Sequence, residues 1–132
     1  MKANILPPTD RASFDNAINA ILDEHNTLRR LALSVSQRPG FSSDDAMSLA
    51  DAMTAHEETE ARLFAMPFVT RPPESVISTG ARARRRCQEF TSGDSNLPDP
   101  SAAAALFVDA LLTHLATEEA WLARERKLQI EH

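Results

Sequence analysis

Residues 56–67 read HEETEARLFAMP, and residues 114–122 read HLATEEAWL. In each stretch a glutamate follows a histidine by four residues: Glu60 follows His56, and Glu118 follows His114. A spacing of four places both side chains on the same face of an α-helix, about 6 Å apart, so that each pair can bind one ion from adjacent turns. The two stretches therefore predict two helices that each carry a pair of metal donors.

The surrounding residues show the periodicity of helices packed in a bundle. Apolar or small residues recur at alternating steps of three and four, which is typical of a buried helical seam. The seam positions are Phe14, Ile18, Ile21, His25, Leu28, Ala32 and Val35; Ala46, Leu49, Met53, His56, Glu60 and Leu63; Val76, Gly80, Ala83, Cys87 and Phe90; and Ala104, Phe107, Leu111, His114, Glu118 and Trp121. Four seams predict four helices.

Prolines, glycines and capping residues set the expected boundaries. Residues 1–12 contain Pro7 and Pro8 and no periodic pattern, so we expect an extended N-terminal arm. Residues 13–132 are expected to form a single all-α domain, an up-down-up-down antiparallel four-helix bundle. Its helices are predicted at about 13–37, 43–66, 73–91 and 100–128. The length of 132 residues and the low glycine content, 3 residues, agree with one helical domain.

Three histidines, His25, His56 and His114, fall on the seams of three different helices, near the middle of each. A buried histidine or carboxylate is unfavourable unless it is hydrogen-bonded, paired or bound to a cation. A single His–Glu pair on a helix is more often a solvated surface feature. Two such pairs on seams, joined by a third seam histidine at matching depth, favour a metal site.

Three segments carry a resemblance to a known family. Residues 21–32, ILDEHNTLRRLA, together with the two stretches quoted above, resemble the first, second and fourth helices of hemerythrin-like (HHE cation-binding) proteins. The second helix of that family has a histidine, a glutamate four residues on, and a Leu-Phe-x-Pro-like ending, which Leu63, Phe64 and Pro67 match with one extra residue. The resemblance implies a bundle core with a non-haem di-iron centre that binds dioxygen or serves oxygen, nitric oxide, iron or redox sensing.

Carried over residue by residue, the resemblance implies that His25, His56 and His114 are ligands from the first, second and fourth helices. Glu60 looks like one bridging carboxylate. Glu118 and Glu119 compete for the second, since the family favours Glu119 and the seam favours Glu118.

The third helix departs from the family, which has two histidines there. This chain has none between Pro72 and Gly93, and the matching depth falls at about Gly80 and Arg84. The expected set for one ion is therefore His25, His56, Glu60 and one of Glu118 or Glu119, with His114 left alone. We expect one iron ion rather than a di-iron centre, and the donors also suit manganese or zinc.

Two other functions stay open. In a metal-free descendant acting as an interaction or regulatory module, Arg84 would turn inward and pair with Glu60 and Glu118 in place of a cation. A small non-haem oxidoreductase would use open positions on the same ion. No nucleophile with an adjacent base occurs, so an enzyme is the less favoured class.

Composition limits which binding partners and which cellular compartment we expect for this chain. The formal net charge of −5 argues against nucleic-acid binding, and every apolar run is too short for a membrane span. The single cysteine, Cys87, and the lack of an apolar core in the first residues favour the cytoplasm. Dioxygen or nitric oxide is the expected small ligand, and a sensing role would act through a protein partner or a homo-oligomer.

Overall fold

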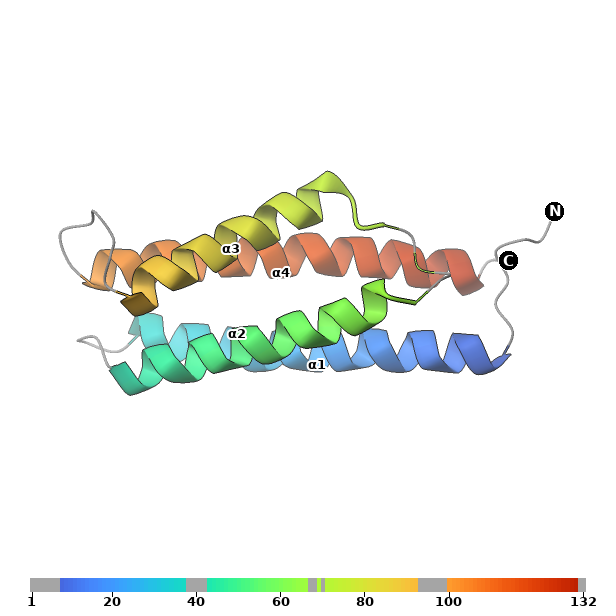
Figure 1. The fold of residues 1–132 in the computed structure, drawn as a ribbon, viewed down its shortest axis with the longest axis horizontal. Coiled ribbons are helices and arrows are strands. Elements are labelled where there is room, and N and C mark those ends of the chain that lie inside the picture. The colour runs from blue at the N-terminus through green and yellow to red at the C-terminus, as the bar shows by residue number, and fades with distance from the viewer. Residues whose placement is uncertain (1–7, 38–42, 67–68, 70, 93–99, 131–132) are drawn as a thin grey trace.

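Four α-helices account for most of the chain in this computed structural model, which describes residues 8–37, 43–66, 69, 71–92 and 100–130. The helices are α1 (Pro8–Gln37), α2 (Ser43–Phe64), α3 (Glu74–Ser92) and α4 (Pro100–Ile130). These described residues include no β-strand. The expectation of an all-α four-helix bundle is confirmed in its helices and in the lack of strands among these residues. Figure 1 shows α1 beside α2 and α3 beside α4.

The N-terminal boundary differs from the expected one. Residues 8–12 were expected in an extended arm, but they form the first turns of α1. Proline is well tolerated at the first position of a helix, where its missing amide hydrogen would have no partner, and Asp10 adds a favourable charge in the first turn. The remainder of the expected arm, residues 1–7, lies outside the described residues.

The other boundaries agree to within two residues. The helix expected at 43–66 ends at Phe64, where amide hydrogens of Ala65 and Met66 continue the chain into a turn through bonds to Ala61 and Leu63. The third helix begins at Glu74, after Pro73, whose carbonyl oxygen accepts bonds from Val76 and Ile77. The fourth runs two residues beyond the expected end, to Ile130.

The seam residues form the core. Every predicted seam residue whose side chain is described is buried, apart from Val35 and Cys87, which are half-buried. The apolar ones form two clusters. One contains Leu28, Met53, Phe107 and Leu111, and the other contains Phe14, Ile21, Leu63 and Trp121. The buried histidines and glutamates occupy the seam positions between the two clusters.

Each helix packs against two neighbours. Helix α1 contacts α2 and α4, and α3 contacts α4 and α2; α2 and α3 form the loosest of these contacts. None of the described helices has an apolar stretch long enough to cross a membrane.

We predict that Leu111→Ala destabilises the protein by about 2–5 kcal/mol, since Leu111 is fully buried among the first cluster and its truncation leaves a cavity. The matched control is Leu106→Ala on the same helix, where the side chain is exposed; it should change stability by about 0.5 kcal/mol or less. Urea denaturation measures both. Equal losses in the two variants would contradict the assigned core.

Candidate metal centre

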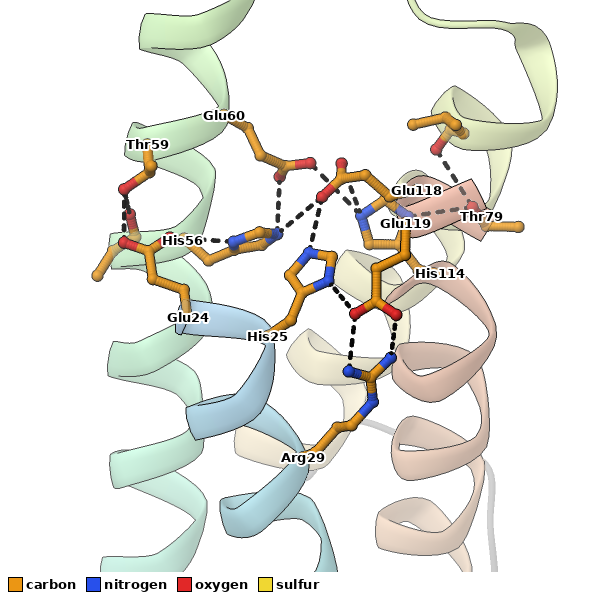
Figure 2. A network of polar contacts seen from close by, with 12 residues as sticks. Glu24, His25, Arg29, His56, Thr59, Glu60, Thr79, His114, Glu118 and Glu119 are labelled. Atoms are coloured by element: carbon orange, nitrogen blue, oxygen red, sulfur yellow. Dashed lines mark hydrogen bonds and ion pairs between the residues drawn. The ribbon is translucent and has the colours of Figure 1, made fainter. Parts of the chain in front are cut away.

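Two helices bring four donor side chains to one point in the bundle. Helix α2 supplies His56 and Glu60, and α4 supplies His114 and Glu118. One ligand atom from each lies within 4.8 Å of all the others, and all four residues are buried. Figure 2 shows the two imidazoles and the two carboxylates facing one another. The described residues thus contain a buried His/Glu cluster that could hold a metal ion.

The distances within this cluster are longer than good hydrogen bonds. His56 Nε2 lies 3.3 Å from Glu118 Oε1 and 3.5 Å from Glu60 Oε1. His114 Nε2 lies 3.6 Å from Glu60 Oε2 and 3.7 Å from Glu118 Oε2. His56 Nε2 and Glu118 Oε2 are buried with no hydrogen-bond partner. Buried polar atoms without partners are rare, because each loses its hydration without compensation.

These separations are close to those between the ligands of a metal ion. Metal–nitrogen and metal–oxygen bonds of 2.0–2.2 Å in a tetrahedral site place neighbouring ligand atoms about 3.3–3.6 Å apart. The four nitrogen–oxygen separations, 3.3 to 3.7 Å, lie in or near this range, but both carboxylates face His56 with Oε1 and His114 with Oε2. One ligand atom from each residue lies within 4.8 Å of the others, so the side chains would draw closer together around a single ion. The residues present therefore fit a single divalent ion.

The outer nitrogen of each imidazole has a separate partner. His56 Nδ1 lies 3.1 Å from Glu24 Oε1, and the hydroxyl of Thr59 donates to Glu24 Oε2 at 2.6 Å. His114 Nδ1 lies 3.0 Å from the hydroxyl oxygen of Thr79, which itself donates to the carbonyl of Ser75. Both Nδ1 atoms therefore donate outward, which directs Nε2 at the cluster. Metal-binding histidines are oriented in this way.

His25 stands beside the cluster rather than within it. Its Nε2 lies 2.8 Å from Glu118 Oε1, and its Nδ1 lies 2.7 Å from Glu119 Oε2. Arg29 in turn binds both oxygens of Glu119, at 2.7 and 2.8 Å. Figure 2 shows this chain of contacts from Arg29 to Glu118. With both ring nitrogens engaged by carboxylates, His25 supports Glu118 from outside the group of four.

The arrangement differs from the expected ligand set in its histidines. His114, expected to stand alone, belongs to the group of four, whereas His25 does not. Of the two competing glutamates, Glu118 faces the cluster, as its seam position indicated, and Glu119 faces His25 and Arg29.

Arg84 and Cys87 do not join the cluster. Arg84 is exposed and forms no ion pair with another residue in the described ranges, so the metal-free alternative lacks its expected counter-charge.

Burial, with the nearby Glu57, raises the pKa of Cys87 to about 11. The thiol is therefore protonated near neutral pH, which is unfavourable for redox chemistry or metal binding.

The pKa values show how the cluster is neutralised without a metal. Burial opposes the charge on His56, but the carboxylates of Glu118 and Glu60 outweigh it and raise its pKa to about 9. Burial raises the pKa of Glu60 to about 7. Burial acts in the same direction on Glu118, but the contacts with His25 and His56 hold its pKa below the usual range. Protons thus occupy the place that a cation would take.

Sequence reasoning missed the outer contacts made by Glu24, Arg29, Thr59 and Thr79. Glu24 and Thr59 directly precede His25 and Glu60, so they begin just off the seam, at the edge of the buried face. Polar residues at such edges are also typical of a solvated surface. No spacing in the sequence distinguishes a residue that contacts the cluster from a solvated surface residue.

We predict that Glu60→Gln changes the pH dependence of stability in the metal-free protein. Because the folded-state pKa of Glu60 is raised to about 7, its stabilising contribution is present below the unfolded pKa and is lost as the pH rises through 7. The check is denaturation of the variant and of the native chain at pH 5 and pH 8 in the presence of chelator. Relative to the native chain, the variant should have a higher free energy of unfolding at pH 8 than at pH 5. A difference that is the same at both values would contradict the burial of this carboxylate.

Comparisons with known proteins do not assign a family. No family model matches the chain, and no curated protein or solved structure matches it.

Proposed function

We propose that this protein is a metal-binding protein of the hemerythrin-like type that holds one divalent ion in its core. The ligands in this proposal are His56, Glu60, His114 and Glu118. The observation that carries it is the set of four buried donors that each place one ligand atom within 4.8 Å of the others. Two atoms of this set, His56 Nε2 and Glu118 Oε2, have no hydrogen-bond partner. The proposal includes the up-down-up-down antiparallel topology, which the packing of each helix against its neighbours supports.

One ion is supported better than two. Both carboxylates face His56 with Oε1 and His114 with Oε2, as bridging carboxylates do, but the remaining seam histidine, His25, already has a carboxylate at each ring nitrogen. At the same depth α3 presents Gly80, which has no side chain to offer. A second ion would need donors that neither α1 nor α3 provides.

Iron is the proposed ion, and two imidazoles with two carboxylates also suit manganese or zinc. Four protein ligands leave room for one or two further ligands, since iron and manganese commonly take five or six. A bound ion would supply an open coordination position for a small molecule such as dioxygen or nitric oxide. We place the protein in the cytoplasm, where it would sense such a ligand or handle iron, with a protein partner or a second copy relaying the signal.

The metal-free interaction module is the weaker candidate. It was expected to use Arg84 as the counter-charge of Glu60 and Glu118, and the side chain of Arg84 is exposed and does not reach them. The oxidoreductase alternative uses the same ion as the proposed function.

We predict that protein purified without chelator contains about one equivalent of iron, manganese or zinc per chain. Elemental analysis checks this, because four preoriented donors should retain an ion through purification. Less than about a tenth of an equivalent, unchanged after anaerobic loading with Fe(II), would rule out the proposed function.

We also predict that the two central histidines differ in their effect on metal affinity. His114→Gln removes a ligand, whereas His25→Gln removes a support of Glu118, for which losses of about 10- to 100-fold are typical. His114→Gln should therefore weaken binding at least about ten times more than His25→Gln. Competition with a chelator of known affinity measures both, and the reverse order would show that His25 is the ligand.

A further inference from the structure

A surface groove runs between α2 and α3. It consists of two cavities of about 290 and 250 Å³ that share the side chain of Arg84 as a lining residue. Its walls extend from Ala50 to Phe64 on α2 and from Val76 to Thr91 on α3. The two helices form the loosest contact between neighbours in the bundle. The groove therefore follows most of the length of both helices at the place where they pack least closely.

The two walls of the groove carry opposite charges. Glu57 lines it from α2, and the adjacent Glu58 is exposed. Arg84 lines it from α3, and the adjacent Arg85 is exposed. Glu57 and Arg84 border the same cavity, yet none of these four residues forms an ion pair with another residue in the described part of the chain. An acidic wall and a basic wall are thus both available to a partner.

A partner for this groove needs both charges in a matching arrangement. A uniformly anionic partner would be repelled by the α2 wall, and a uniformly cationic one by the α3 wall. A second copy of the chain has the required pattern. Rotation by 180° about an axis along the groove places α2 of each copy opposite α3 of the other, at the same level. Glu57 of each copy then faces Arg84 of the other, so that one contact is formed twice.

Small side chains next to these charges allow a second copy to approach closely. Ala50 lines the groove, and the exposed Ala61 follows Glu57 by one helical turn. On α3 the exposed Ala81 follows Ile77 by one turn, and Ile77 is a half-buried apolar residue of the groove. The distance between packed helices is set by the size of the side chains at the contact. The face therefore combines small residues, an apolar contact and two opposite charges.

The size of this face indicates a weak dimer. Two helices that meet a second copy over roughly 22 Å bury about 500 Å² per copy, at the low end for specific interfaces. Apolar burial over such an area is modest, so the two symmetric charge pairs have a large share in partner choice. Such an interface is sensitive to salt.

We propose that the groove between α2 and α3 is the interface of a symmetric homodimer, in which Glu57 of each copy pairs with Arg84 of the other. The inference goes beyond the proposed function, because the dimer requires no bound metal.

Charge reversals test this pairing, because they can both break and restore it. Glu57→Arg makes both walls basic, and Arg84→Glu makes both walls acidic, so neither variant should dimerise with itself. A mixture of the two variants should dimerise, because every wall then faces a wall of opposite charge. Asp109→Arg and Arg82→Glu are the matched controls, since both positions are exposed and line neither cavity. Sedimentation equilibrium measures the dissociation constants, and circular dichroism checks that each variant is folded.

At about 100 μM protein and about 50 mM NaCl, the native chain and both controls should have an average mass well above the 14.5 kDa of one chain, falling towards it in about 1 M NaCl. Each groove reversal should raise the dissociation constant at least about tenfold, because two like-charge contacts replace two pairs. The equimolar mixture should return to within about threefold of the native value. Arg84→Gln, which removes the charge without reversing it, should weaken the dimer by about threefold and replaces any reversal that impairs folding.

A native chain that stays monomeric under these conditions would overturn the inference, whatever other protein binds the groove. A dimer that persists in both groove variants would show that another face joins the copies. Equal losses in the controls, or a mixture of folded variants that stays monomeric, would also contradict the pairing of Glu57 with Arg84.

Discussion

Two carboxylates and two imidazoles that meet inside an apolar bundle must be neutralised by one another, by protons or by a cation. In this protein they do not neutralise one another through short hydrogen bonds, since the closest separation between His56 and Glu118 is 3.3 Å. The layer is closed on both sides by apolar clusters, one around Leu111 and the other around Trp121. Besides the contact of His25 with Glu118 at 2.8 Å, ions and protons are therefore the remaining means of compensation.

The four helices contribute to this layer in different ways. Helices α2 and α4 supply the inward donors. Helix α1 supplies outer contacts, with Glu24 on one imidazole and His25 on Glu118. Helix α3 supplies the hydroxyl of Thr79 and the bare backbone at Gly80. The result is a buried site whose donors come from two helices and whose outer contacts come from the other two as well as from α2 and α4.

Protons and a metal ion compete for the same atoms. His56, with a pKa of about 9, and Glu60, with a pKa of about 7, both hold protons at neutral pH or near it when no metal is bound. A cation would displace these protons, so metal binding would release them to solvent. The same buried groups that make the empty site unfavourable would make the occupied site stable, which links the function proposed for this fold to its packing.

The sequence by itself determined which face of each helix is buried, since periodicity fixes the relative orientation of residues within one helix. Phe14, Leu63, Phe107 and the other seam residues are accordingly buried as predicted, as are the three central histidines. The seam also favoured Glu118 over Glu119, whereas only the tertiary structure decided which of these histidines enters the group of four and that Arg84 faces outward. Those outcomes depend on the rotation and axial offset of one helix against another. His25 meets Glu118 across 93 residues of chain, and packing over the whole bundle sets that register, which no local pattern encodes.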